Sequence, residues 1–274
     1  MMDTITVRKM PFEFPDEIDP VFIEGDPEIS FSMIAGSLLL PHLEPYLIRS
    51  MRAAMEHVSD PKLLDALKRF SAQEGQHFRM HAKFNAAIRK AGFPKLEQFE
   101  RELAADYKRF SETKSLKFNL AYAEGFEALT MNAIKFIMDP NGFDNPESPI
   151  IQMFEWHFVE ELEHRNVTFD VYDHVCGGYF YRLFAGIYAQ WHFTSWIRKV
   201  NVYMLEVMPP PARSPEVKRA RKQFERAERR RAFRKLLPAI MRIYLPSYTP
   251  HDLEISPAMQ VLADKYTELA TSTS

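Results

Sequence analysis

The sequence has almost no cysteine and lacks several motifs that identify common enzyme classes. The single cysteine, Cys176, cannot form an internal disulfide, and a four-cysteine zinc site is excluded. Neither a Gly-rich phosphate loop nor a G-x-S-x-G elbow is present, which argues against nucleotide hydrolysis and serine-esterase chemistry. A reducing compartment fits this use of cysteine.

Long apolar runs are also missing. Residues 1–20 mix charges with prolines and contain no apolar stretch of the kind found in signal peptides. The longest weakly charged stretch, 183–197, contains Gln190 and His192 and is too short and too polar to span a bilayer of about 30 Å. We therefore expect a cytoplasmic protein without a transmembrane segment.

The composition is that of an ordinary globular protein. The 274 residues are 46% hydrophobic and 26% charged, and the formal net charge of −2 indicates no particular partner. A basic stretch over 216–235 also contains Glu225 and Glu228, which favours a solvent-exposed or partner-facing helix. Nucleic-acid binding is therefore not expected.

Helical periodicity begins near Ser32, and no series of strands is visible. Breakers such as Pro61, Gly92 and Gly177 separate long predicted helices over 32–57, 61–91, 113–138, 148–175 and 179–207, with shorter ones near 95–111 and 216–235. We predict an all-α fold with an extended N-terminal arm over 1–31, an antiparallel four-helix bundle over 32–175 and a C-terminal helical extension over 176–274 packed on the bundle.

Two Glu-x-x-His units stand out, Glu74 with His77 and Glu161 with His164. The i, i+3 spacing places both side chains of a unit on one helix face. A chain with nine histidines should contain about one such unit by chance, so the arrangement of the units must decide their meaning. Glu163 lies between members of the second unit, and its side chain is expected to point away from the row of predicted ligands.

Four predicted helices carry ionisable residues in the middle of an otherwise apolar, core-facing row. These residues are Glu44, Glu74, His77, His81, Glu124, Glu127, His157, Glu161 and His164. Unpaired carboxylates in an apolar core would take up protons, whereas metal ions would neutralise them. The rows therefore indicate metal binding, and a polar network without metal is the alternative.

The glutamates also lie at matching levels. Glu44 and Glu74 are each 15 residues from Ser59, and Glu127 and Glu161 are each 17 residues from Asp144, at the two predicted turns. Residues equidistant from the turn of an antiparallel hairpin lie side by side. Four carboxylates and two imidazoles are thus expected to hold two metal ions, and this oxygen-rich set favours iron or manganese over structural zinc. The six ligands are Glu44, Glu74, His77, Glu127, Glu161 and His164.

This ligand pattern resembles the ferritin-like di-iron carboxylate proteins over about residues 32–175, which implies two iron ions, with manganese or a mixed manganese–iron pair as alternatives. The chain is also similar in layout to the bacterial family called predicted metal-dependent hydrolases. The segments that carry this second resemblance are EGQHFRMHAKFN and WHFVEELEHRNVTFDVYDHV.

Further residues extend the resemblance. His157 resembles an additional metal-binding histidine of di-iron arylamine N-oxygenases, and Glu160 resembles the acidic residue that holds a ligand histidine from behind in many di-iron oxygenases. Gln73 departs from that pattern in the other half. We place His81 and Glu124 around the ligands. Alternatively, His157 and His81 are hydrogen-bonded core histidines without metal. Glu124 could also be the ligand in place of Glu127, one turn later.

Three functions suit this ligand set. The leading hypothesis is an oxidoreductase that activates O2 with electrons from a donor and oxidises a small organic substrate. The alternative is a hydrolase that uses a metal-activated water, which the family name favours. Iron or manganese storage is the third, although the C-terminal extension argues against a cage. A homodimer is compatible with the sequence.

Overall fold

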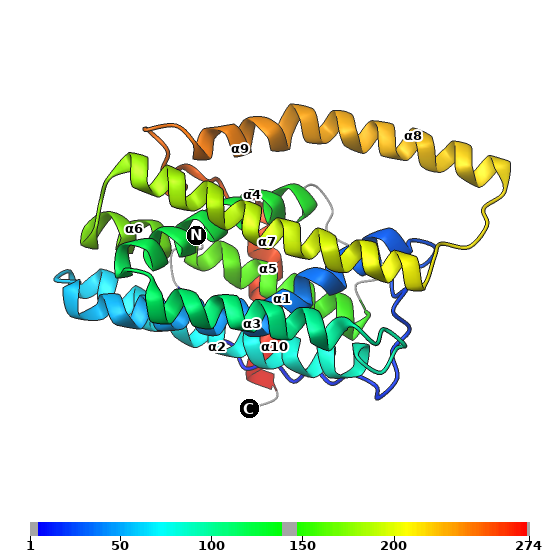
Figure 1. Cartoon of the computed structure of the whole chain (residues 1–274), viewed down its shortest axis with the longest axis horizontal. Helices are drawn as coiled ribbons and strands as arrows, with labels where there is room; N and C mark the ends of the chain where they lie inside the picture. Colours follow the sequence, from blue (N-terminus) through cyan, green and yellow to red (C-terminus); the bar gives the residue numbers. More distant parts are fainter. Residues whose placement is uncertain (1–4, 139–146, 273–274) are drawn as a thin grey trace.

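The computed structural model describes residues 5–138 and 147–272, and over these ranges its regular secondary structure is entirely helical (Figure 1). The predicted all-α fold is confirmed. The predicted turn centre Asp144 lies outside the described residues. The bundle consists of α1 (Pro27–Ala54), α2 (Pro61–Ile88), α4 (Leu116–Met138) and α5 (Pro149–His164).

The other helices surround this bundle or extend from it. They are the 3-10 turn η1 (Met55–His57), α3 (Leu96–Thr113), α6 (Val167–Val175), α7 (Tyr179–Val207), α8 (Pro215–Arg231), the π turn η2 (Ala232–Leu236), α9 (Leu237–Ile243), the 3-10 turn η3 (Pro250–Asp252) and α10 (Pro257–Ser272). No helix in the described ranges is both long and apolar enough to cross a membrane.

Local signals explain where α1 and α2 begin. The side chain of Asp26 accepts a hydrogen bond from the amide of Ile29, and the side chain of Asp60 accepts one from the amide of Lys62. A proline follows each cap at the first helical position, where its missing N–H costs nothing. The prediction that the first helix starts at residue 32 was therefore wrong, because the cap at Asp26 starts it earlier.

The predicted single helix over 148–175 was also wrong. The structure has two helices, α5 and α6, separated at Arg165 and Asn166. The backbone angles of Asn166, φ −92° and ψ −21°, remain close to helical values, so the chain is distorted there without reversing direction. Asparagine weakens a helix interior because its side chain competes for backbone groups. The break follows His164 directly.

Helix α1 contains two prolines, Pro41 and Pro45, on either side of Glu44. A proline has no N–H, so Pro41 leaves the carbonyl of Ser37 without its usual helical partner. The side-chain amide of Asn85 on α2 donates to that carbonyl over 2.9 Å. The neighbouring helix thus satisfies the backbone group that the proline frees.

Helices α4 and α7 pack closely against each other at two glycines. A Cβ built on Gly125 would lie 2.3 Å from the Cα of Gly186, whereas one built on Gly186 would meet the Cα of Gly125 at an ordinary 3.5 Å. The side-chain amide of Gln190 donates to the carbonyl of Gly125 over 3.1 Å. Because α4 carries Glu127, this contact helps to fix the position of one predicted ligand.

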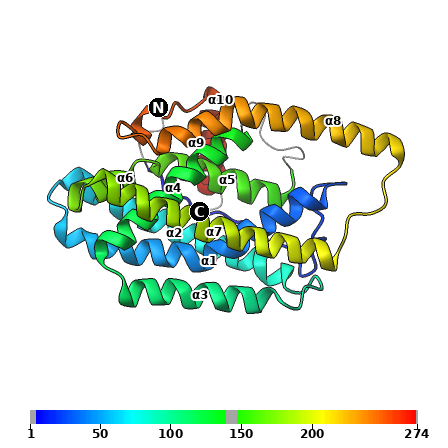
Figure 2. The same cartoon turned by 45° about the horizontal axis from the view of Figure 1, so that its top comes forward.

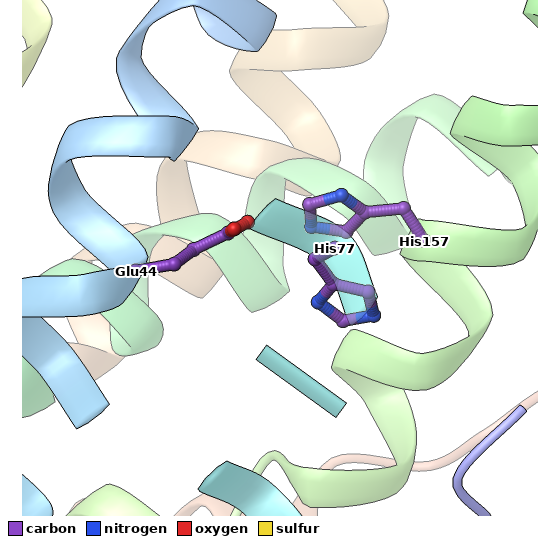
Figure 3. Close-up of side chains that lie close together, drawn as sticks. All are labelled: Glu44, His77 and His157. Carbon is purple, nitrogen blue, oxygen red and sulfur yellow. The ribbon is translucent and has the colours of Figure 1, made fainter. Parts of the chain in front are cut away.

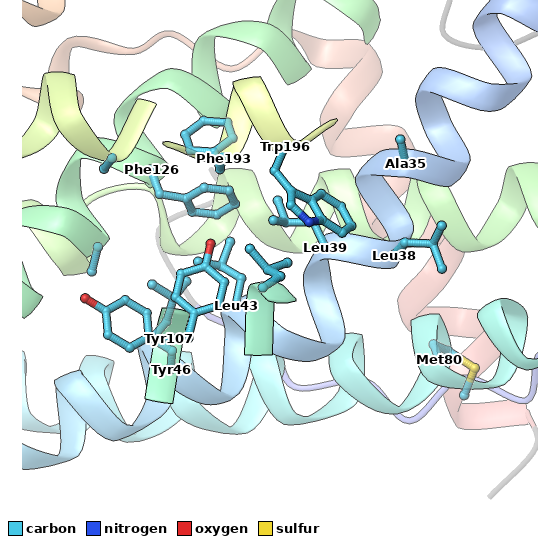
Figure 4. Close-up of a cluster of buried hydrophobic side chains, with 14 of the residues drawn as sticks. Ala35, Leu38, Leu39, Leu43, Tyr46, Met80, Tyr107, Phe126, Phe193 and Trp196 are labelled. Atoms are coloured by element: carbon cyan, nitrogen blue, oxygen red, sulfur yellow. The ribbon is translucent and has the colours of Figure 1, made fainter. Parts of the chain in front are cut away.

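A large apolar core lies where α1, α3, α4 and α7 meet (Figure 4). Tyr46 and Tyr107 stack with ring centroids 5.0 Å apart, and the indole of Trp196 donates to the carbonyl of Phe99 over 3.2 Å. Helix α7 spans 179–207 as predicted and packs on this core. It therefore covers the bundle along the side formed by α1 and α4.

The last part of the chain packs unevenly. Helix α10 lies against α5, where the hydroxyl of Tyr266 donates to the carboxylate of Glu155 over 2.7 Å. Helix α8 has no buried residue, and both views show it standing away from the bundle (Figures 1 and 2). The predicted basic helix over 216–235 corresponds to α8 followed by the π turn η2.

Candidate metal centre

The six predicted ligands meet inside the bundle. Each of the four bundle helices contributes at least one of them, and none is more than 2% exposed. They are Glu44 on α1, Glu74 and His77 on α2, Glu127 on α4, and Glu161 and His164 on α5. The core-facing rows inferred from the sequence therefore share one interior.

Two groups of three side chains have the spacing of metal ligands. In each group, one donor atom from every residue lies within 4.8 Å of the others. The first group is Glu44, His77 and His157, and Figure 3 shows the carboxylate of Glu44 facing the two imidazole rings. The second group is Glu74, Glu161 and His164.

Glu161 connects the two groups. One of its oxygens lies 3.5 Å from Nδ1 of His77, and the other lies 3.5 Å from Nε2 of His164. Glu127 lies beside the second group, with an oxygen 3.9 Å from Nε2 of His164. The two groups therefore form one continuous cluster.

Most of the oxygen and nitrogen atoms of this cluster that could bind a metal are buried but lack hydrogen-bond partners within the described residues. Both carboxylate oxygens of Glu44, Glu74 and Glu127 are in this state. So are one oxygen of Glu161, Nδ1 of His77 and Nε2 of His164. Buried polar atoms in folded proteins are nearly always paired, so this concentration of free acceptors around one point fits a site for cations.

The electrostatics agree with a shortage of positive charge. Burial, with the charge of Glu74 added, raises the pKa of Glu44 well above its usual value. Burial and the charge of Glu161 likewise raise the pKa of Glu127. Burial acts against ionisation of Glu161 too, but His164 and His157 hold its pKa well below the usual value. Metal ions would allow all the carboxylates to ionise together.

The two predicted ligand histidines, His77 and His164, are held from outside the cluster. Nε2 of His77 lies 3.0 Å from a carboxylate oxygen of Glu160, and Nδ1 of His164 lies 2.9 Å from the side-chain oxygen of Gln73. Because both partners are acceptors, the outer nitrogen of each ring donates, so in the neutral ring it is the inner nitrogen that keeps a lone pair. This is the tautomer that a metal-binding imidazole needs.

His81 and Glu124 both lie outside the two donor groups. The ring of His81 bridges Nδ1 of His157, at 2.6 Å, and the hydroxyl of Ser37, at 2.8 Å. Glu124 accepts a hydrogen bond from the guanidinium of Arg182 over 2.9 Å. Burial raises the pKa of Glu124 to about 7, although Arg182 opposes the shift. Glu124 is thus directed toward α7, away from the donors.

The resemblance had indicated Glu160 behind a histidine, where the structure places it, but the sequence assigned no such role to Glu163 or Arg8. Glu163 points away from the donors, as expected, but it is only 7% exposed and accepts hydrogen bonds from Gln73 and from Arg8 of the arm. One available signal was the pair Glu160 and Glu163, which repeats the i, i+3 spacing on the same helix. Arg8 lies in a segment without periodicity, so no local pattern distinguishes it.

Most of the chain matches one protein family. Comparisons with curated proteins and with solved structures found no match. Residues 6–254, which include all of the donor residues, match the family described as "Predicted metal-dependent hydrolase". Since this match covers most of the sequence, the chain belongs to the family of predicted metal-dependent hydrolases.

Proposed function

We propose that the buried cluster binds two metal ions and that the protein is a hydrolase acting on a small organic substrate. The observation that carries the proposal is the set of inward-facing acceptor atoms without hydrogen-bond partners in the described part of the chain. Family membership supports hydrolysis over oxidation. The oxygen-rich donor set suits iron or manganese.

Each donor group would hold one ion, and Glu161 lies where it can contact both. Two bound ions would lower the pKa of a water molecule and polarise a carbonyl or phosphoryl oxygen. Aromatic rings close the surroundings: the ring of Phe70 lies 4.7 Å from that of His164, and the ring of Trp156 lies 5.0 Å from that of His77. These rings keep bulk water away from the histidines.

Oxidation of a small organic substrate by O2 is the second candidate. The observation that favours it is the donor set itself, with four buried carboxylates and at least two imidazoles. This reaction would need an electron donor, whereas hydrolysis would not. The dependence of turnover on O2 therefore separates the two candidates.

The first prediction concerns stoichiometry and reaction class. Protein loaded with Fe²⁺ or Mn²⁺ should hold about two ions per chain, because each helical hairpin supplies one Glu and one Glu-x-x-His unit. Elemental analysis measures the content. Turnover of ester, amide and phosphate-ester panels should be equal with and without O2. A folded sample that binds at most one ion would contradict the dinuclear site, and O2 consumption with an absorbing intermediate would favour oxidation.

The second prediction concerns His157. Burial, together with nearby His77, lowers the pKa of His157 to about 4, so its ring is neutral near pH 7. The Nε2 of His157 lies 2.9 Å from Glu161. If this nitrogen binds an ion, His157→Ala should keep most of the metal but change the metal's absorption spectrum. The control is His192→Ala, which removes a partly buried histidine on α7. A lower melting temperature with an unchanged spectrum would show that His157 is only a core residue.

A further inference from the structure

Arg8, in the arm before α1, lies buried against α5 directly behind the candidate metal centre. Its side chain is 3% exposed and its guanidinium contacts two carboxylates, Glu160 at 3.1 Å and Glu163 at 2.6 Å. Its Nε donates to the hydroxyl of Thr267 on α10 over 2.9 Å. One arginine therefore joins the arm, α5 and α10.

Each of these carboxylates leads to a different ligand histidine. Glu160 accepts a hydrogen bond from Nε2 of His77 over 3.0 Å. Glu163 accepts one from the side-chain amide of Gln73 over 2.9 Å, and the oxygen of the same amide faces Nδ1 of His164 at 2.9 Å. The guanidinium thus contacts the first residue of both series of hydrogen bonds, one leading to His77 and the other to His164.

The backbone of the arm takes part in the same network. The amide of Thr6 donates to Glu163 over 3.0 Å, and the amide of Arg8 donates to Glu160 over 3.2 Å. The side-chain amide of Gln73 donates to the carbonyl of Thr6 over 3.0 Å. Residues 6–8 can make these contacts only when the arm is docked against α2 and α5.

The physical cost of losing Arg8 is large. Without the guanidinium, two buried carboxylates would lack their cation. Removing one partner of a buried ion pair strongly destabilises the folded protein, because the other partner remains as an uncompensated buried charge. The planar guanidinium can donate to both carboxylates at once, whereas the ammonium of a lysine is a single compact charge. The orientation of Glu160 and Glu163 therefore depends on an arginine at this position.

We infer that Arg8 is a positioning residue for both ligand histidines, and that docking of arm residues 6–8 and metal binding stabilise each other. The inference rests on the proposed metal centre. Coupling of this kind is reciprocal: if the docked arm strengthens metal binding, bound metal must strengthen docking by the same factor.

The test uses the full chain with Co²⁺ as a spectroscopic probe. We expect Arg8→Gln to lower the affinity for both ions by about 10- to 100-fold, the range for residues that orient ligands from behind, and to alter the Co²⁺ absorption spectrum. Gln73→Leu should weaken the ion held by the His164 group more than the other ion, because Gln73 contacts His164 directly and reaches the rest of the network only through Glu163 and the arm. Arg69→Gln is the matched control, because Arg69 contacts the carbonyl of Ile5 in the arm but neither carboxylate.

Hydrogen exchange of the arm gives a readout that does not depend on activity. In the wild type, Co²⁺ should slow exchange of the amides of Thr6 and Arg8, and in Arg8→Gln it should not. Unchanged affinity and spectrum in a folded Arg8→Gln protein would overturn the inference and leave the metal centre intact. Folded wild type that takes up no Co²⁺ would overturn the metal centre itself. If Arg8→Gln does not fold, Arg8→Lys decides, and wild-type affinity in that variant overturns the inference.

Discussion

Replacing Glu161 by alanine is expected to reduce metal affinity by more than about 100-fold, beyond the range found for residues that only orient ligands. Glu161 lies 2.9 Å from His157 and 3.5 Å from both His77 and His164, so its loss affects both donor groups. Hydrolytic activity should fall to the level of metal-free protein. Elemental analysis after dialysis measures the metal content, an activity assay measures the turnover, and circular dichroism checks that the helices are retained.

The control for Glu161→Ala must be chosen away from the network. Glu163→Ala is unsuitable, since Glu163 holds Arg8 and Gln73. Glu112 on α3 is suitable, because its side chain is 60% exposed. Glu112→Ala should keep the wild-type metal content. A Glu161→Ala protein that retains two ions and full activity would remove Glu161 from the centre.

The second large effect is expected at the contact between α4 and α7. Gly125→Ala places a methyl group 2.3 Å from the Cα of Gly186, where neither backbone can yield without moving a helix. Overpacking of this kind costs about 1–3 kcal/mol and occasionally more, and we expect the upper end because the clash is with backbone. Thermal or urea unfolding measures the loss.

Gly186→Ala is the matched control, since it adds the same methyl group to the partner helix at the same crossing. The new Cβ would lie 3.5 Å from the Cα of Gly125, an ordinary contact, so the loss of stability should be clearly smaller. Equal effects of the two substitutions would show that helix propensity, and not the clash, decides. Displacement of α4 should also lower metal content in Gly125→Ala, because Glu127 lies two residues further along the helix.

The helical rows were the part of the molecule that sequence reasoning could reach. The 3.6-residue period places Glu74 with His77, and Glu161 with His164, on single helix faces. Equal distances from a turn place glutamates of the two helices of a hairpin side by side. The structure places all of these side chains within one buried cluster. Periodicity within a helix and level across a hairpin both depend on residues near each other in the sequence.

Contacts between distant segments could not be predicted in this way. Arg8 meets Glu160 across 152 positions of the chain, and the arm that carries it has no period from which a face could be assigned. Gln73 was noted only as a departure from a pattern, although its amide links Glu163 to His164. The start of α1 was misplaced for another reason: the cap at Asp26 lies before the apolar period becomes visible.

The proline at position 41 links helix stability to the geometry of the site. Asn85 donates to the carbonyl of Ser37 that Pro41 frees, the hydroxyl of Ser37 donates to Asn85, and the same hydroxyl contacts His81. An alanine at position 41 would regain part of the roughly 3 kcal/mol that an interior proline costs a helix, but its N–H would compete with Asn85 for that carbonyl. Selection for stability alone would therefore favour replacing Pro41, whereas selection for a fixed His81 would retain it.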